Sequence, residues 1–417
     1  MAAPSRIVSL ATSIEQNTRI VDTYINENGL PSPSFAASTP PDIPLPAEIS
    51  KAKDEALEAM DELQALLLGP MNKVVHDLIH VPTSLTSLHA IAKLDLASKF
   101  PPNTTTTIAE LAQKSGLHES DCTRLVRHAV NHRLFTEPSP GVVAHSAATS
   151  AIATVPLFRA WIEEGCAIMW SSAPHIVPAM QRWPGSEEPS QTAYNLAQHT
   201  PRSFFADIAH DASGARAARF ADSMSFFQAS PALRTQLLVD NYDWSACGVV
   251  VDVGGSHGVV AAELVRRYPK LRAVVQDLPE VIAAAPTGVD RVEFQAHDFF
   301  TEQPVRDADV YLLRMILHNW GDAYCIRILR QLVPALKPGA RIVINDHVVL
   351  EPGVLSAYKD RPVRSFDLVM KACFNAKERD VHDWTSLLRE ADERFVVAGV
   401  KRPEGSQLQI VDVAWSG

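Results

Sequence analysis

The sequence lacks long hydrophobic runs and has few cysteines. No apolar stretch approaches the roughly 18 residues that a membrane-spanning helix needs, and the apolar patch 7–11 is too short for a signal peptide. The 5 cysteines of the 417-residue chain are scattered without the C-x-x-C or Cys/His spacing of a metal or redox site. We therefore expect a cytoplasmic protein with reduced, buried cysteines and no metal site.

An excess of positive charge is also missing. The formal net charge is -10, which argues against a nucleic-acid partner. A hydrophobic content of 46% with 21% charged residues is typical of a soluble globular protein. The length is too great for one ordinary core and predicts two or three domains.

A glycine-rich stretch organises the second half of the chain. Residues 249–253 form an apolar run broken only by Asp252, which predicts a buried parallel strand. Gly254 and Gly255 end the run, and Gly258 opens a helical pattern. The order strand, glycine turn, helix brings backbone amides close to a nucleotide-type cofactor at the carboxyl end of a strand.

The spacing around this turn indicates which cofactor binds. A dinucleotide fingerprint would need glycine where Ser256 and Val259 stand, so a pyrophosphate is excluded. Asp277 ends a second strand pattern at 271–275, at roughly the 20-residue distance from Gly254 expected of a ribose-binding carboxylate. A ligand with a ribose and no pyrophosphate is predicted, and S-adenosylmethionine fits this description.

Four regions are expected along the chain. Helical patterns at 4–27 and 48–68 flank a proline-rich connector at 30–46, and their apolar faces need a partner surface on the same chain or on a second subunit. The regions are a helical N-terminal dimerisation segment with this connector at 1–75, a winged-helix-like module at 76–150, a helical substrate-pocket region at 151–235 and a cofactor-binding domain at 236–417.

The second region contains the pattern of a winged helix. Two short amphipathic helices within 107–134 precede a small hairpin at 142–145. Such a module can bind DNA, and Arg124, Arg127 and Arg133 supply local positive charge. Because the chain is acidic and no basic arm flanks the module, a structural or dimerising role is favoured.

The third region is helical and rich in aromatic and methionine side chains. Most of them are expected in the core, but they also suit the wall of a pocket for a flat organic substrate. Met169 and Trp170 are candidates from this region, and Cys373 and Phe374 from further along the chain.

The fourth region alternates strands and helices, which predicts an α/β fold with a doubly wound, Rossmann-like sheet. The last two strands are separated only by 404–406, so the final strand must run antiparallel. Strands are expected at 248–254, 271–276, 291–296, 308–313, 341–346, 394–400 and 407–414, and helices at 258–268, 279–285, 322–336 and 380–391.

Ligands in such sheets bind beyond the carboxyl ends of the strands, so the residues that follow each strand are site candidates. Asp298 can accept from an adenine amino group while Phe299 covers the ring. Arg314 can pair with the cofactor's carboxylate or with neighbouring acids. His318 lies one turn beyond a strand, near the expected position of the methyl-bearing sulfur.

Six motifs in this order and spacing make the pattern specific. They are VDVGGSHG, QDLP, AHDFF, DVYLLRMILHNW, LKPGARIVI and FNAKER. With them the chain resembles, over essentially its whole length, the class I S-adenosylmethionine-dependent O-methyltransferases of the plant caffeate and fungal secondary-metabolite type. The resemblance implies S-adenosylmethionine as cofactor, a homodimer built on N-terminal helices, a winged-helix module and a small aromatic or polyketide substrate.

The resemblance also implies roles for particular residues. His318 is the expected general base, flanked by Asp346 and Glu378. Met315 stands where plant enzymes often have tryptophan, and Asn319 replaces a common aspartate. The expected cofactor contacts are Gly254, Gly255, Ser256, Asp277, Leu278, Asp298, Phe299, Arg314 and Met315, and the expected substrate contacts are His297, Trp170, Met169, Cys373, Phe374 and Trp320.

The expected reaction is methyl transfer to a phenol or enol. An imidazole with an ordinary pKa near 6.5 suits removal of the hydroxyl proton at neutral pH. One alternative is a methyltransferase-like pericyclase of pyridone or polyketide biosynthesis, which binds the cofactor without consuming it and uses a basic residue at the position of His297. A cofactor-sensing DNA-binding regulator is a third hypothesis.

Overall fold

The computed structural model describes residues 4–417, which form two compact units. The first, here the helical unit, contains the chain up to Ala167 together with Ala215–Phe226 and Ser356–Lys359. The second, here the sheet unit, contains Ile168–Gly214, Phe227–Leu355 and Asp360–Gly417. All candidate catalytic, cofactor and substrate residues belong to the sheet unit.

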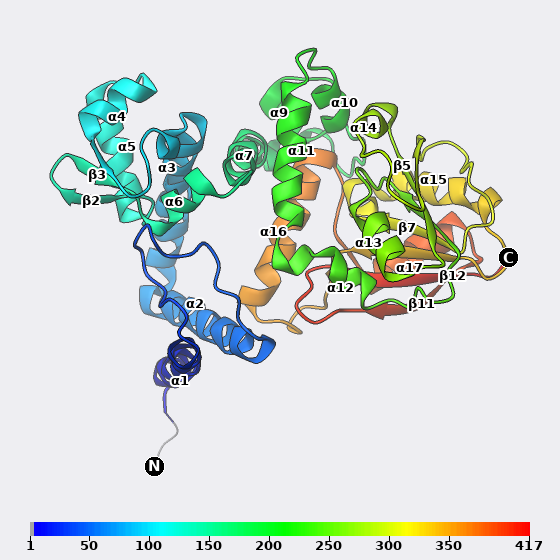
Figure 1. Ribbon diagram of the computed structural model, residues 1–417, viewed down its shortest axis with the longest axis horizontal. Coiled ribbons are helices and arrows are strands. Elements are labelled where there is room, and N and C mark those ends of the chain that lie inside the picture. Colours follow the sequence, from blue (N-terminus) through cyan, green and yellow to red (C-terminus); the bar gives the residue numbers. More distant parts are fainter. Residues whose placement is uncertain (1–3) are drawn as a thin grey trace. The chain divides into compact units, whose positions relative to one another are not determined.

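The N-terminal helices of the helical unit are long. Helix α1 (Arg6–Glu27) packs along α2 (Ala47–Val75), which continues beyond the expected end at residue 68 (Figure 1). Gly69 has a φ of 69° and is followed by Pro70, so α2 bends there and continues as a second helical piece. A π-helical turn η1 (His76–His80) then leads into α3 (Val81–Lys93).

A winged-helix module follows, as expected. Helices α4 (Ile108–Ser115) and α5 (Glu119–Asn131) precede a hairpin, and an antiparallel three-stranded sheet has the order β1-β3-β2. The side chains of Thr107 and Glu110 form a capping box that starts α4, and Gly116 with a φ of 74° ends it. The strands are β1 (Thr105–Thr107), β2 (Thr136–Ser139) and β3 (Val142–Ala144).

The remaining helices outside the sheet were expected only in part. No element was expected at α16 (Ala357–Phe374), whose first turns are polar and include Pro362. The others are η2 (Leu96–Ser98), α6 (Ala147–Thr154), α7 (Phe158–Glu164), η3 (Gly165–Trp170), η4 (Ala173–His175), α8 (Ile176–Arg182), α9 (Ala193–Gln198), α10 (Phe204–Ala209), α11 (Ala215–Gln228) and η5 (Pro231–Leu233).

Seven strands form the central sheet in the order β11-β12-β8-β7-β4-β5-β6. Strand β12 pairs antiparallel with both neighbours, and the pairs among β4 to β8 are parallel, which confirms the predicted doubly wound sheet with an antiparallel last strand. The strands are β4 (Val249–Val253), β5 (Arg272–Asp277), β6 (Val292–Ala296), β7 (Val310–Arg314), β8 (Arg341–Asp346), β11 (Phe395–Lys401) and β12 (Gln409–Trp415).

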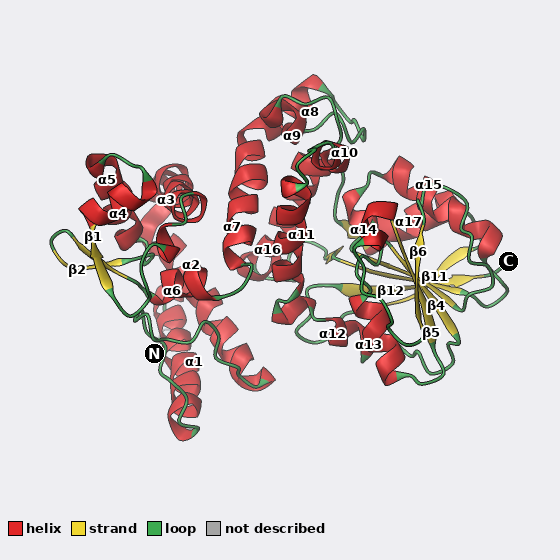
Figure 2. Cartoon of the chain, turned by 45° about the horizontal axis from the view of Figure 1, so that its top comes forward, coloured by secondary structure: helices red, strands yellow, loops and turns green. Residues whose placement is uncertain are grey.

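Alternation along the strands creates a core on each face of the sheet. Val250 and Leu312 pack with α13 on one face, whereas Val251 and Tyr311 pack with α15 and α17 on the other. Figure 2 shows α13 on one side of the strands and α15 and α17 on the opposite side. The sheet helices and short elements are α12 (Thr235–Val239), α13 (Val259–Arg267), α14 (Pro279–Ala283), η6 (Leu317–Asn319), α15 (Asp322–Leu332), η7 (Val333–Ala335), β9 (Val348–Val349), β10 (Arg379–Asp380) and α17 (Val381–Ala391).

All five cysteines are free thiols, and Cys247 is only half-buried, whereas the other four are buried as expected. Within residues 4–417, no helix combines the length and the apolar character needed to cross a membrane. The same residues contain no cluster of three or more His, Cys, Asp or Glu side chains able to hold a metal ion.

Candidate active site

The glycine turn after β4 requires residues without a side chain. A Cβ on Gly254, whose φ is 72°, would lie 2.5 Å from Cδ1 of Ile316, and a Cβ on Gly255 would lie 2.6 Å from the Asp252 carboxyl group. The backbone N–H groups of both glycines donate to the carbonyl of Gln276, at 2.7 and 3.1 Å. The turn is therefore held against β5, and its backbone is closely covered by the side chains of Ile316 and Asp252.

Asp277 links the end of β5 to this turn. Its carboxylate accepts from the backbone N–H of Ser256 at 2.9 Å and of Leu278 at 2.8 Å. Burial raises the pKa of Asp277, and these two hydrogen bonds act in the opposite direction. Each carboxylate oxygen has a second lone pair, so Asp277 can still accept from ribose hydroxyl groups.

A second carboxyl group lies below the glycine turn. Asp252 is fully buried, its Oδ2 has no hydrogen-bond partner among residues 4–417, and burial raises its pKa to about 7. The charge of Arg314 acts against this shift in pKa. When the buried carboxyl group of Asp252 is ionised, it places negative electrostatic potential beneath the glycine turn.

Asp298 and Phe299 begin the loop after β6. One carboxylate oxygen of Asp298 accepts from the backbone N–H of Phe300 at 2.9 Å. The Phe299 ring lies 3.9 Å from the position that a Cβ on Gly254 would occupy. The structure thus brings this aromatic face to the glycine turn, where an adenosyl group is expected.

Arg314 and Met315 are engaged with the protein. The Arg314 guanidinium donates to Oδ1 of Asn345 at 3.0 Å and to the carbonyl of Leu233 at 2.5 Å, and burial lowers its pKa. Met315 has a φ of 55° and donates its N–H to the carbonyl of Asn345 at 3.1 Å. Asn345 therefore fixes both residues, a role that the sequence analysis missed although Asn345 immediately precedes Asp346.

The three expected catalytic residues meet in a buried cluster. The Nδ1 atom of His318 lies 3.0 Å from Oε1 of Glu378, and the two side chains are 6% and 0% exposed. Burial lowers the pKa of His318, but the charges of Glu378 and Asp346 raise it, and the net shift is upward. The cluster is a pre-formed pair of imidazole and carboxylate, as a general base with an orienting acid requires.

Asp346 completes the cluster from the end of β8. Its side chain is fully buried, and burial raises its pKa to about 6. Neither carboxylate oxygen has a side-chain or backbone partner that meets hydrogen-bond geometry within residues 4–417. His347, the next residue, is also buried, and burial lowers its pKa. The site therefore concentrates titratable groups with shifted pKa values, which is typical of catalytic sites.

The three side chains of the cluster, His318, Asp346 and Glu378, come from separate elements. His318 lies in η6, which follows β7, and Asp346 is the last residue of β8. The two residues meet because parallel strands place their carboxyl ends at the same edge of the sheet. Glu378 precedes β10, which pairs parallel with β9. The backbone N–H of Glu378 donates to Asp367 in α16 at 2.9 Å. The side-chain amide of Asn319 donates to the carbonyl of Met315 at 3.0 Å and so links the two ends of the loop that holds His318.

Aromatic side chains of α10, of α16 and of the segment that follows His318 pack together. Phe374 packs against Phe204 and Phe205 with ring centroids 4.9 and 5.4 Å apart, and Phe205 lies 6.4 Å from Trp320. Cys373 is buried beside Phe374, and burial raises its pKa to about 12. Two expected substrate residues, Phe374 and Trp320, are thus joined through Phe205 from α10.

The other expected substrate residues remain predictions. Met169 and Trp170 end η3. His297 follows β6, donates its backbone N–H to the carbonyl of Asp277 at 2.9 Å, and has a pKa lowered by burial. His297 therefore lies beside the expected ribose-binding residue.

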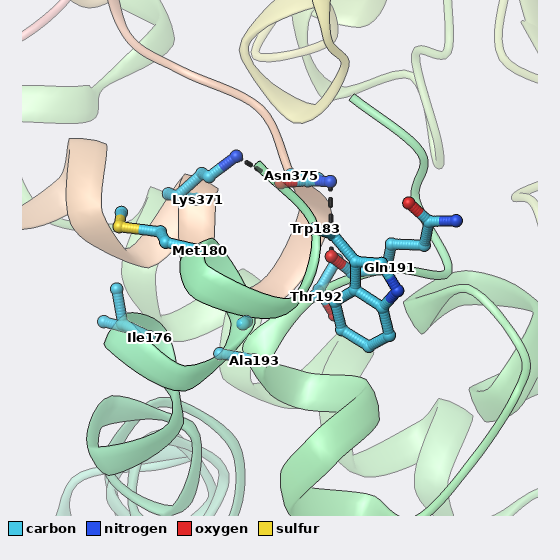
Figure 3. A pocket seen from close by; sticks show the side chains of 9 residues that line it. Ile176, Met180, Trp183, Gln191, Thr192, Ala193, Lys371 and Asn375 are labelled. Carbon is cyan, nitrogen blue, oxygen red and sulfur yellow. Dashed lines mark hydrogen bonds between the residues drawn. The ribbon is translucent and has the colours of Figure 1, made fainter. Parts of the chain in front are cut away.

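A small cavity lies between α8, α9 and the end of α16 (Figure 3). Its volume of about 10 Å³ is enough for one water and far too small for a substrate. Lys371 donates to Oδ1 of Asn375 at 2.5 Å, and Asn375 donates to the carbonyls of Glu188 and Gln191 at 3.1 and 3.3 Å. The hydrogen bonds tie α16 to the 186–191 loop, which is a structural role.

Comparison with known proteins identifies the family. The model of the family described as O-methyltransferase domain matches residues 187–393. The chain is 41% identical over 436 residues to O-methyltransferase pyvH of Aspergillus violaceofuscus, with 100% of both chains covered. It is 36% identical to the chlorophenol O-methyltransferase of Trichoderma longibrachiatum (99% and 91% covered) and 37% identical to the grayanic acid biosynthesis cluster O-methyltransferase of Cladonia grayi (99% and 88% covered). The chain belongs to this O-methyltransferase family.

Solved structures share the fold. OxaC matches with a TM-score of 0.79 at 20% identity, covering 99% of this chain and 100% of that one. LepI in complex with SAM matches at 0.74 and 21% identity, and a structure titled "A Pericyclic Reaction enzyme" at 0.73 and 21%, each covering 98% of this chain and 100% of the other. These matches confirm the predicted methyltransferase-like fold.

Proposed function

We propose that the protein is an S-adenosylmethionine-dependent O-methyltransferase that methylates a phenolic or enolic hydroxyl of a small aromatic or polyketide-type secondary metabolite. The observation that carries the proposal is the buried pair of His318 and Glu378, 3.0 Å apart, at the carboxyl edge of the sheet. The names of the related proteins, which include a chlorophenol O-methyltransferase and a biosynthesis-cluster enzyme, support this class of acceptor.

The residues of the glycine turn fit the cofactor. Gly254 and Gly255 leave no room for side chains at the turn, and the carboxylate of Asp277 faces the same segment. Asp277 would hold the ribose hydroxyls, while Asp298 and Phe299 would hold the adenine. When bound, S-adenosylmethionine supplies a methyl group activated by a positively charged sulfur.

The side chains of this protein supply the base and the orientation. Oε1 of Glu378 accepts a hydrogen bond from the N–H at Nδ1 of His318, which leaves Nε2 with a lone pair for the acceptor's hydroxyl proton. As the proton moves to Nε2, the carboxylate stabilises the imidazolium that forms. Phe205, Phe374 and Trp320 provide apolar surface that excludes water and aligns a flat acceptor with the base.

His318→Gln tests this proposal. We expect turnover to fall about 10²-fold or more, because the glutamine amide cannot accept the proton, while affinity for S-adenosylhomocysteine stays nearly unchanged. Candidate phenols are incubated with the enzyme and S-adenosylhomocysteine is quantified, with cofactor affinity measured by calorimetry. His382→Gln, on the exposed side of α17, is the control and should retain wild-type turnover. A His318 variant that methylates at the wild-type rate would show that another group is the base.

A pericyclase is the second candidate function. The fold matches a structure titled as a pericyclic reaction enzyme, and the half-buried His297 lies next to Asp298 at the end of β6. The presence of His318, Asp346 and Glu378 together favours methyl transfer, because that reaction must remove the acceptor's hydroxyl proton. Product formed without S-adenosylhomocysteine would decide for the pericyclase.

We also propose that the protein acts as a homodimer. Apolar side chains are exposed on α2, η1 and α3, and an apolar groove of about 450 Å³ lies between α1 and α2. Exposed apolar side chains of this kind indicate a protein partner, and a second copy is the partner that the family resemblance implies for the N-terminal helices. The most exposed of these side chains are Leu67, Met71, Val74 and Leu78, at 68%, 82%, 65% and 73%.

A nucleic-acid partner is not proposed. Arg127, one of three candidate basic residues in the winged-helix module, is paired with Glu137 at 3.0 Å, and Arg133 lies over the Phe35 ring at 4.8 Å. Both guanidinium groups therefore have partners within the protein. The five free cysteines support a reducing compartment, and we propose the cytoplasm.

A further inference from the structure

One buried charged side chain beside the loop that holds His318 has no part in the chemistry proposed above. Arg379 follows Glu378 directly, is fully buried, and carries its guanidinium under the loop that holds His318. Nη1 donates to the carbonyl of Leu317 at 3.1 Å, and Nη2 donates to the carbonyl of Trp320 at 2.8 Å. These two carbonyls lie one residue before and two residues after His318.

The charge of Arg379 is compensated within the protein. Asp322, the first residue of α15, accepts from Nε and Nη2 at 2.9 and 2.7 Å. Cys325 lies 3.3 Å from Nη2, and the guanidinium packs over the Trp384 ring at 5.2 Å. Because a buried guanidinium is tolerated only with such partners and its donors form a rigid plane, the side chain has little freedom to move.

The dipeptide Glu378-Arg379 thus holds the base in two ways. Glu378 fixes the imidazole through Nδ1, and Arg379 fixes the backbone on both sides of the same residue. The dipeptide is itself anchored, because Arg379 begins β10, which pairs parallel with β9 just after Asp346. A displacement of the backbone around His318 would break these charge-assisted hydrogen bonds in a buried site.

We propose that Arg379 is a positioning residue that sets the place of His318 through the carbonyls of Leu317 and Trp320. This inference deepens the proposed function, because it rests on His318 as the base. Arg379 touches neither the acceptor nor the cofactor in this role. Its effect should therefore appear in the rate of the chemical step and leave cofactor affinity unchanged.

Arg379→Lys is the direct test, because lysine keeps the charge but cannot reach two carbonyls and Asp322 in one plane. We expect kcat to fall about 10-fold or more, because small misplacements of a base are costly, with the affinity for S-adenosylhomocysteine within about twofold of wild type by calorimetry. Lys377→Gln is the matched control: Lys377 also pairs with Asp322, at 2.8 Å, but leaves every contact of Arg379 in place.

The dependence of kcat/KM on pH distinguishes a specific effect of Arg379 on His318 from a general loss of structure. The charge of Arg379 lowers the pKa of His318. Arg379→Gln removes that charge, so the acid limb of kcat/KM should move to higher pH, whereas Arg379→Lys should leave the limb in place. Wild-type kcat in Arg379→Lys, or an equal fall in Lys377→Gln, would overturn the proposal.

Two further measurements distinguish a wrong positioning role from a misfolded variant and from a wrong assignment of the base. If neither Arg379 variant folds, Asp322→Asn, which weakens the anchor of the guanidinium, should reproduce the fall in kcat with unchanged cofactor affinity, and a wild-type kcat would refute the positioning role. His318→Gln is assayed in parallel. Full activity of that variant would show that another group is the base and so remove the premise of this inference, whereas an inactive His318→Gln beside a fully active Arg379→Lys would refute only the positioning role.

Discussion

At the residue scale, the base is controlled by charges that the chain brings together from distant positions. Glu378 is 60 residues from His318 in sequence and 3.0 Å away in space. Burial alone would lower the pKa of the imidazole, but Glu378 and Asp346 raise it overall. The neutral form accepts the substrate proton, so activity should be lost as the pH falls through this raised pKa.

Glu378→Gln tests this electrostatic control. The variant keeps an acceptor for Nδ1 but removes the charge that raises the pKa of His318, so the acid limb of the rate profile should move to lower pH. The plateau rate should fall about 10-fold or more, because the imidazolium loses its counter-charge. The measurement is kcat/KM against pH, with the exposed Glu390→Gln as control.

Burial raises the pKa of Asp346 to about 6, and the charge of Asp346 in turn raises the pKa of His318, so the acid limb belongs to the coupled cluster. An acid limb that stays at the wild-type position in Glu378→Gln would contradict the role given to this carboxylate. Movement to higher pH would contradict the sign of its effect.

At the element scale, the helix that follows the glycine turn has an unusual C-terminal cap. Arg291, with a φ of 59°, donates from Nη1 to the carbonyls of Tyr268, Pro269 and Leu271 at 3.0–3.1 Å, and from Nη2 to that of Val265 at 2.6 Å. These carbonyls belong to the last turn of α13 and to the segment leading into β5. A cation at this end also suits the helix dipole.

Arg291→Ala should therefore destabilise the fold. Loss of these charge-assisted hydrogen bonds is expected to lower the free energy of unfolding by about 1–3 kcal/mol. Urea denaturation followed by circular dichroism should give a lower midpoint with an unchanged slope. Arg272→Ala, on an exposed position at the start of β5, should unfold at the wild-type midpoint. A midpoint of Arg291→Ala equal to that of wild type would show that water replaces the cap without cost.

At the scale of the whole molecule, the exposed apolar surface of α2, η1 and α3 predicts the oligomeric state. Leu78 is 73% exposed on η1. Leu78→Glu should convert the dimer to a monomer, because a carboxylate cannot be buried there without a partner. Light scattering coupled to size-exclusion chromatography measures the mass.

Val177→Glu is the control for this test. Val177 is 62% exposed but belongs to the sheet unit, so its variant should remain dimeric. A monomeric wild-type protein, or a Leu78→Glu variant with the mass of a dimer, would contradict the assignment of this surface.

Local sequence patterns were enough to predict the sheet and the edge at which the chemistry is expected. Strand periodicity and short connections predicted seven strands with an antiparallel last one, because alternation and loop length are local properties. The positions of Asp277, Asp298 and His318 followed, since Asp277 ends a strand and the other two residues follow one within about a turn. The pairing of His318 with Glu378 came from the family resemblance and could not be derived from spacing.

The contacts that control the base became visible only in the folded protein. The polar first turns of α16 gave no clear helical signal, so the helix that carries Asp367 and Phe374 was missed. The role of Asn345 in holding Arg314, and that of Arg379 under the His318 loop, depend on pairs of residues from different elements. Such pairs, and the burial that raises the pKa of Asp346, arise only when the chain is folded, because neither separation in space nor desolvation is encoded in local sequence.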